Sequence, residues 1–237
     1  MRFELKAEGY TEAAAVQAVL AEWVAEWVEP SWTDALRVLE LGAGTGLLTR
    51  HLASRGPLTA TDISRGMLDE GRRRLPSVRW EIADAWDPAG GPVDRLYSAA
   101  ALQWTADPQL TFQRWRTLLA PGGRMVHGLF VPPTLPELEA VAGDVFPLRW
   151  RPAAEWIAAL ECAGFQVKRW ETKCVQQPHA GALSFLRQLH DTGVTAARPR
   201  IGAGRLRSII GELDRRYAGA DGRVSVTWSL LRFEASR

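Results

Sequence analysis

The feature that most constrains this chain is an apolar strand that runs directly into a glycine-rich turn. Residues 38–46 read Val-Leu-Glu-Leu-Gly-Ala-Gly-Thr-Gly, and the Leu-Leu-Thr-Arg-His-Leu-Ala that follows (47–53) has helical spacing. Because glycine has no Cβ, the backbone can turn sharply at such positions and a ligand can approach it closely. The turn then lies at a helix N-terminus, where backbone N–H groups face the ligand. The pattern therefore predicts a ligand-binding turn of an α/β fold.

The turn could bind a dinucleotide or S-adenosylmethionine, and a purely structural glycine turn is the third interpretation. A dinucleotide fingerprint places its third glycine at the position that Leu47 occupies here. Glu40 precedes the first glycine by two residues, where its charge would oppose a pyrophosphate. S-adenosylmethionine carries a sulfonium, an ammonium and one carboxylate, so it tolerates this acid. The spacing favours S-adenosylmethionine.

Two further strands also end in acidic residues. Residues 58–64 predict a short strand that ends at Asp62, 18 residues after Gly44, where a carboxylate can accept both ribose hydroxyls. Residues 78–85 predict a third strand that ends at Asp84, and a carboxylate there can accept the exocyclic amine of an adenine. Met67 would supply an apolar wall to the base. Each acid alone would be read as a helix cap or a solvated residue, but three in register indicate a site.

These residues resemble the class I S-adenosylmethionine-dependent methyltransferases. The resemblance covers the glycine turn, Asp62, the Asp84-Ala85 step and the Leu-Ala-Pro-Gly-Gly-Arg turn at 119–124. It implies S-adenosylmethionine as the cofactor and a set of residues around it. The expected cofactor contacts are Glu40, Gly42, Ala43, Gly44, Asp62, Ile63, Met67, Asp84, Ala85 and Ser98.

The rest of the chain predicts one α/β domain with a seven-stranded, mostly parallel, doubly wound (Rossmann-like) sheet and a small helical lid. The expected strands are 36–41, 58–62, 78–83, 93–98, 123–130, 166–173 and 224–234, the last of them the candidate antiparallel strand. The expected helices are 11–28, 46–54, 65–74, 107–119 and 153–162. The single domain, 1–237, divides into an N-terminal helical arm (1–30), the core sheet (31–175 and 219–237) and the lid (176–218) over the mouth of the site.

Composition limits the remaining classes. The two cysteines, Cys162 and Cys174, suggest neither a disulfide framework nor a metal site. The absence of a leader or a long apolar run predicts a cytoplasmic protein that does not bind membranes. Residues 1–146 carry 14 Lys and Arg against 19 Asp and Glu, whereas residues 147–237 carry 15 against 8. The basic last third suggests an acidic partner, although these arginines would equally serve as solvated helix faces. No nucleic-acid-binding module is apparent.

Gln103 and Trp104 close the predicted fourth strand at the methyl end of the cofactor, so we expect them at the acceptor. Packing under the next helix is an equal alternative for Trp104.

A narrower resemblance, to the malonyl-acyl-carrier-protein O-methyltransferases of biotin synthesis, runs along almost the whole chain. Its pieces are Tyr10 with Gln17, Ala-Leu-Gln-Trp (101–104), Thr-Leu-Pro-Glu-Leu (134–138), Arg149 with Pro152, Ala-Leu-Ser-Phe-Leu-Arg (182–187), Thr-Gly-Val-Thr (192–195) and Val-Thr-Trp (226–228). The chain departs from that family at Tyr-Thr-Glu-Ala-Ala-Ala (10–15), which lacks a common histidine, and at Gly193-Val194. The Leu-Gln-Trp element is shared with trans-aconitate methyltransferases, which are the alternative.

The narrower resemblance implies methylation of the free carboxyl of malonyl-acyl carrier protein. A carboxylate is ionised at neutral pH, so the reaction needs no general base, and none of the four histidines is marked as one. Arg149 is the candidate for binding the malonyl carboxylate, and Tyr10 for closing an N-terminal arm over the cofactor. The lid arginines expected to face the acidic carrier protein are Arg187, Arg198, Arg200, Arg205 and Arg207. A protein that binds the cofactor without catalysis would carry the same glycine turn and remains open here.

Overall fold

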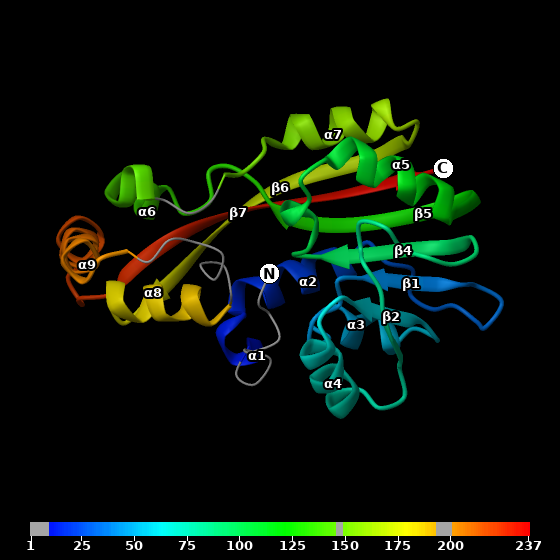
Figure 1. Ribbon diagram of the computed structural model, residues 1–237, viewed down its shortest axis with the longest axis horizontal. Coiled ribbons are helices and arrows are strands. Elements are labelled where there is room, and N and C mark those ends of the chain that lie inside the picture. The colour runs from blue at the N-terminus through cyan, green and yellow to red at the C-terminus, as the bar shows by residue number, and fades with distance from the viewer. Residues whose placement is uncertain (1–9, 146–148, 193–200) are drawn as a thin grey trace.

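A mixed sheet forms the centre of the structure, a computed structural model that describes residues 10–145, 149–192 and 201–237 (Figure 1). The strands are β1 (Val38–Leu41), β2 (Thr59–Asp62), β3 (Arg79–Ile82), β4 (Val93–Ala99), β5 (Leu119–Phe130), β6 (Gln166–His179) and β7 (Val224–Ser236). Their order across the sheet is β3-β2-β1-β4-β5-β7-β6. Neighbours from β3 to β5 pair in parallel, whereas β7 pairs antiparallel with both β5 and β6. The expected seven-stranded, mostly parallel sheet with an antiparallel last strand is confirmed.

Helices cover both faces of this sheet. They are α1 (Tyr10–Ala13), α2 (Ala15–Ala25), α3 (Thr49–Ala53), α4 (Arg65–Arg74), α5 (Pro108–Leu118), α6 (Pro136–Ala142), α7 (Ala153–Cys162), α8 (Ala182–Asp191) and α9 (Ala203–Tyr217), with 3₁₀ turns η2 (Leu102–Trp104) and η3 (Gly143–Val145). In Figure 1, α5 and α7 lie together on one side of the sheet, and α2 lies on the other. Strong start signals fix two of these helices: the Ser64 hydroxyl accepts from Met67 N–H at α4, and the Asp107 carboxylate accepts from Leu110 N–H before Pro108 at α5.

Alternation along β4 shows how the sheet divides the core. Leu96 packs into a cluster with Trp115 of α5, whereas Tyr97 packs into a cluster with the helices of the opposite face. Successive side chains of a strand point to opposite faces, so a central strand covered on both sides must be apolar throughout. All four residues of β1 are buried, and three of them are apolar; Glu40 is the exception to this rule.

The N-terminal helix α2 is held to the sheet by a buried arginine of β7. Arg232 is 6% exposed, and its guanidinium lies 4.4 Å from the ring centre of Trp23 and 4.0 Å from that of Trp27. It also forms 2.8 Å ion pairs with Glu26 of the helix segment and Glu171 of β6. The described part of the expected N-terminal arm is therefore packed onto the sheet by cation–π and charge contacts.

The lid helices are connected to a two-stranded ribbon of β6 and β7 that extends past the rest of the sheet. β5 pairs with β7 only as far as Leu230, whereas β6 stays paired with β7 to Val224. α8 and α9 join the two strands, and Figure 1 shows them, with α6, beyond the ends of the parallel strands. β6 reaches His179, so residues 176–179, which we expected in the lid, are strand.

Two expected helices differ in detail. The helix expected at 46–54 is only Thr49–Ala53, because the glycine turn continues to residue 48. The helix expected at 11–28 is divided at Ala14 into α1 and α2. In the described parts of the chain, no helix has the length and apolar character needed to cross a membrane.

Candidate functional site

A cavity of about 530 Å³ opens at the carboxyl ends of the parallel strands. This is where open α/β sheets bind ligands, since the turns after several strands meet there. The ends of β1, β2, β3 and β4 line one part of it, and Phe130 of β5 and Trp228 of β7 line another. Tyr10 of α1 and Thr192, directly after α8, bring the arm and the lid to the same cavity.

The glycine turn forms the floor of the cavity near β1. Gly42 and Gly44 have φ values of +65° and +57°, a conformation that side chains rarely adopt. A Cβ on Gly42 would lie 2.6 Å from the Ala101 Cβ, whereas a Cβ on Gly44 would meet no atom within 4 Å. Gly42 therefore serves close packing, and Gly44 leaves open space for a ligand.

Asp62 connects this turn to β2. Its Oδ2 accepts a 2.9 Å hydrogen bond from Gly44 N–H, and its Oδ1 accepts one of 2.8 Å from Ser64 N–H. Burial raises the pKa of this carboxyl, and the backbone N–H groups of Ser64, Gly44 and Ile63 oppose that rise. The carboxylate keeps further lone pairs, so it can still accept ribose hydroxyls.

Glu40 lies at the bottom of the cavity and is 1% exposed. Its Oε2 has no hydrogen-bond partner among the described residues. Burial raises the pKa of this carboxyl to about 8; the nearby Thr49 hydroxyl lowers it and the charge of Asp62 raises it further. A buried acid without a cationic partner suits a site that receives a positively charged ligand.

Another part of the cavity brings together the residues that we expected around an adenine. Asp84 is exposed there, and its Oδ1 accepts a hydrogen bond of 2.9 Å from Trp86 N–H. Met67 is buried beneath, whereas the Ile63 side chain is 65% exposed beside it. Ala85 also lines the cavity, and its carbonyl accepts a hydrogen bond from the indole N–H of Trp115. An exposed isoleucine between two acids gains apolar contact when a flat base covers it.

Tyr10 faces the cofactor half of the cavity. Burial, with a further contribution from the charge of Asp62, raises the pKa of its phenol to about 12. The phenol therefore stays protonated and can donate a hydrogen bond at all physiological pH values. We expected Tyr10 on an arm that closes over the cofactor. Its position at the start of α1, where it interacts with the charge of Asp62, suits that role.

The second half of the cavity lies over β4, β5 and β7. Ala100 has a left-handed φ of +60°, and its carbonyl accepts a 2.7 Å hydrogen bond from Gln103 Nε2. Gln103 and Trp104 line the cavity where we expected the acceptor. Phe130 packs between the rings of Trp150 and Trp228, at centroid distances of 6.0 and 5.2 Å. These three side chains are called the aromatic wall below.

The charge of the cavity is one-sided. Its acidic lining residues are Glu40, Asp62 and Asp84, and among the described residues no lysine, arginine or histidine side chain lines it. The aromatic wall and Gln103 are neutral. The cavity therefore favours a cationic ligand in one half and a ligand of low negative charge in the other.

Two residues that we expected to contact the ligands do not line the cavity. Ser98 is 1% exposed and, like Leu96, points to the face of the sheet opposite Tyr97, because alternate residues of β4 share a face. Its side chain therefore does not reach the cavity. Arg149 is exposed and is not a lining residue, although its neighbour Trp150 is.

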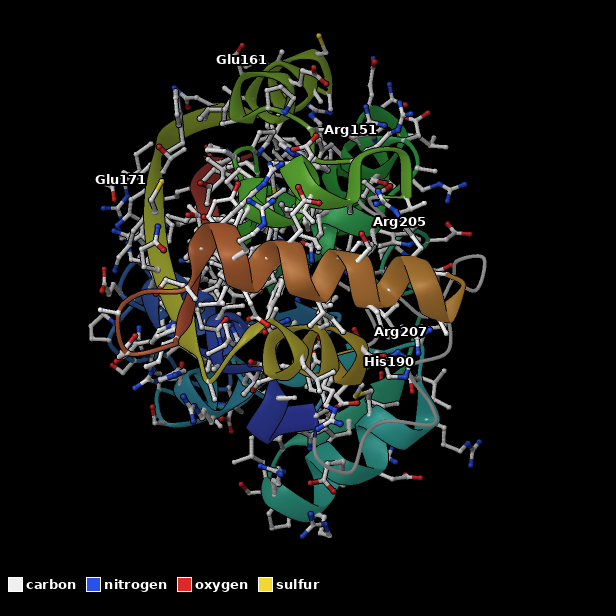
Figure 2. All side chains as sticks on the ribbon, turned by 90° about the vertical axis from the view of Figure 1, so that its left-hand side faces the viewer. Arg151, Glu161, Glu171, His190, Arg205 and Arg207 are labelled. Carbon is white, nitrogen blue, oxygen red and sulfur yellow. The ribbon has the colours of Figure 1, made fainter. Side chains whose placement is uncertain are left out.

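The lid arginines divide into three cases. Arg198 and Arg200 lie outside the described residues. Arg205 donates to the carbonyls of Val141 and Ala142 at 3.3 and 3.1 Å, so it holds the C-terminal end of α6. Arg187 and Arg207 are exposed. Figure 2 shows Arg205 and Arg207 on opposite sides of α9, with Arg207 toward His190.

Several lining residues were not expected from the sequence. They are Gln17, Trp86, Phe130, Trp150, Thr192 and Trp228, together with small residues of the turns. Trp86 directly follows the Asp84-Ala85 step, and that adjacency could have identified it. Trp228 and Trp150 lie in two pieces of the narrower resemblance, although neither was given a role there, whereas Phe130 carries no local signal.

Comparison with known proteins fits this geometry. Residues 38–123 match the family described as "Methyltransferase domain". A trans-aconitate 2-methyltransferase of Variovorax paradoxus is 33% identical over 204 residues, which cover 77% of this chain and 78% of the relative. A malonyl-[acyl-carrier protein] O-methyltransferase of Brevibacillus brevis is 29% identical over 240 residues, which cover 91% and 86%. The crystal structure of the YcgJ protein from Bacillus subtilis has the same fold, at 14% identity and a TM-score of 0.62 over 96% of this chain and 98% of that one.

Proposed function

Since this chain belongs to the class I S-adenosylmethionine-dependent methyltransferases, we propose that it methylates a carboxylate, the free carboxyl of a malonyl group on an acyl carrier protein. Such a methyl ester would serve biotin synthesis, the pathway of the malonyl-acyl-carrier-protein O-methyltransferases that the chain resembles. The family assignment gives the cofactor, and the acceptor has to be argued from the cavity.

The observation that carries this choice is the charge of the cavity lining. A malonyl thioester brings one negative charge, whereas trans-aconitate brings three. Like charges in one cavity repel, and the unfavourable energy grows with each negative charge that the acceptor adds. With three acids and no cation among the described lining residues, the cavity favours the acceptor with one charge.

The reaction requires the chain only to position the two ligands and to exclude water from the site. When bound, S-adenosylmethionine supplies an electrophilic methyl group: a carboxylate oxygen forms a bond to its carbon, the carbon–sulfur bond breaks, and the electron pair stays on sulfur. Glu40, Asp62 and Asp84 would hold the cofactor by its charged and polar groups. The aromatic wall would exclude water and place the acceptor in line, which supports proximity catalysis. No side chain has to remove a proton, because the acceptor acid is already ionised.

An acidic carrier protein would meet the lid from outside. Arg187 of α8 and Arg207 of α9 are exposed, and Figure 2 shows Arg207 near His190 of α8. The basic balance of residues 147–237 supports an acidic partner. Arg205 is a poor probe of docking, because its guanidinium is already bound to α6.

Transfer of labelled methyl from S-adenosylmethionine tests the proposal. Malonyl carrier protein, malonyl-CoA, free malonate and trans-aconitate are compared under identical conditions. We expect strong labelling of the carrier-linked acid. Labelling of trans-aconitate alone would replace the proposal with a small-molecule carboxylate methyltransferase, which the 33% identical relative supports. Cofactor binding without any labelling would contradict both.

Carrier docking is tested by reversing two charges. We expect Arg187→Glu with Arg207→Glu to raise KM for malonyl carrier protein about tenfold and to leave KM for malonyl-CoA unchanged, since electrostatic pairing acts on encounter. The control is Arg215→Glu with Arg216→Glu, which reverses two charges at the other end of α9, where both arginines pair with Glu212. Equal effects of the two variants would place the carrier elsewhere.

A further inference from the structure

We propose that the indole N–H of Trp228 binds the acceptor carboxylate and that the Gln17 side chain beside it selects acceptors with a single negative charge. The proposal rests on the proposed methylation of a carboxylate and extends it to two side chains. The acceptor is then a monoanionic acid whose neutral part carries a hydrogen-bond donor such as an amide N–H.

Trp228 has an unused donor in the aromatic wall. Its side chain is 4% exposed and lines the cavity, and its Nε1 has no hydrogen-bond partner among the described residues. Trp150 in the same wall differs, because its Nε1 donates to the Thr134 carbonyl at 3.0 Å. A buried N–H without a partner is costly, and a ligand oxygen at this position would remove the cost. The wall therefore contains one indole fixed by the protein and one left for a ligand.

Gln17 contributes the complementary group. It lies on α2, is 6% exposed and lines the cavity, and its Oε1 also lacks a partner in the described part of the chain. Gln17, Thr192 and Trp228 line in addition a crevice of about 10 Å³ under α8. A crevice of that size holds about one water molecule, so these three residues lie where the cavity meets a space too small for the acceptor. A polar group of the acceptor that reaches this part of the cavity can be bound by Gln17 and Trp228.

A neutral donor suits this chemistry. A guanidinium binds a carboxylate through both oxygens and withdraws charge from them. An indole N–H occupies one lone pair and leaves the other oxygen to attack the methyl group. An amide oxygen repels a second carboxylate and accepts an N–H group, so Gln17 selects against di- and tricarboxylates.

Binding of malonyl-CoA to the protein loaded with S-adenosylhomocysteine tests the assignment, with acetyl-CoA as the ligand that lacks the carboxylate. The variant is Trp228→Phe. The matched control is Trp156→Phe, because Trp156 is 1% exposed with an unpartnered Nε1 but lies in the α7 core outside the cavity. Calorimetry gives both Kd values, and the Kd of S-adenosylhomocysteine reports whether each variant keeps its fold.

We expect Trp228→Phe to weaken malonyl-CoA binding about 10- to 100-fold, the range for a hydrogen bond to a charged group, and to leave acetyl-CoA and S-adenosylhomocysteine unchanged. Gln17→Met should weaken both CoA esters and narrow the preference for malonyl-CoA over trans-aconitate. Equal binding of malonyl-CoA by the wild type and Trp228→Phe overturns the proposal. A loss of malonyl-CoA binding in Trp156→Phe as large as that in Trp228→Phe also overturns it, as does a wild type that does not bind malonyl-CoA. Binding that follows the expected pattern without methyl transfer would instead leave this subsite standing and refute the proposed function.

Discussion

The Glu40 carboxyl makes cofactor binding depend on pH. In the empty cavity it is 1% exposed, and burial is the main cause that raises its pKa to about 8. One pH unit below the pKa, roughly 90% of the molecules carry a proton on this group. S-adenosylmethionine brings a sulfonium and an ammonium, and a nearby positive charge favours the ionised carboxylate. Binding must therefore release this proton, and affinity must rise as the pH passes through 8.

The magnitude follows from the empty-site pKa. If the bound carboxyl is fully ionised, about 0.9 proton leaves per cofactor at pH 7, and Glu40 contributes about tenfold tighter binding at pH 9 than at pH 7. Calorimetry at pH 7 in buffers with different ionisation enthalpies counts the protons. The α-amino group of the ligand titrates near pH ~8 as well, so Glu40→Gln, which imitates the protonated acid, is the reference.

We expect the wild type to release about 0.9 proton more than Glu40→Gln at pH 7. Equal release by the two proteins would refute the argument. A second readout is the stability of the unliganded protein. The folded-state pKa lies above the unfolded value of 4.5, so the stability from the neutral acid is present below pH 4.5 and is lost as the pH rises through 8. Glu40→Gln should lose this slope, which urea unfolding at pH 5 and pH 8 measures.

Three other substitutions test the site and the core. Gly44→Ala and Gly122→Ala both force a side chain into a left-handed turn with open space around it, so each should cost about 1 kcal/mol of stability. Only Gly44 lines the cavity, and we expect at least a tenfold rise in cofactor Kd for that variant alone; equal Kd values would contradict the placement. His127 is buried between the rings of Trp115 and Phe233, and burial lowers its pKa to about 3. Its stabilising contribution is present above pH 6.5 and is lost as the pH falls toward 3, by about 1.4 kcal/mol per unit at most. His127→Phe should flatten unfolding free energies between pH 7 and pH 5, and an unchanged slope would be evidence against this cause.

The cofactor half of the cavity was predictable because its signals are local. Glu40, Asp62 and Asp84 lie within two residues of the ends of β1, β2 and β3. Their placement at one edge of the parallel sheet therefore needs no knowledge of distant contacts. The glycine turn adds the positive φ values that such a turn requires. Strand existence and direction followed from the same short-range pattern.

The acceptor half was much less predictable, because it is assembled from distant segments. Trp228 reaches the cavity because β7 runs antiparallel and brings its N-terminal part to the edge where the parallel strands end. Side chains alternate between the two faces of β4, so the Ser98 side chain does not reach the cavity. A shift of one residue along the strand decides this outcome. Arg205 is basic and lies on the lid, yet its partner is the end of α6 rather than solvent. Such outcomes depend on tertiary contacts that charge and spacing do not encode.

The one-sided charge of the cavity has a consequence for the order of binding. Asp62 and Asp84 give the empty site a negative lining that repels a carboxylate, whereas bound S-adenosylmethionine adds a net positive charge beside the aromatic wall. After methyl transfer the sulfur and the ester are both neutral, so the attraction between the two ligands disappears. We therefore expect malonyl-CoA to bind more tightly to protein loaded with sinefungin, in which a charged amine replaces the sulfonium methyl, than to protein loaded with S-adenosylhomocysteine. A difference of about tenfold corresponds to 1.4 kcal/mol, the scale of one charge pair in a partly hydrated site. Equal affinities would show that the acceptor is held without help from the cofactor's charge, and Trp228 and its neighbours would then have to supply all of its binding.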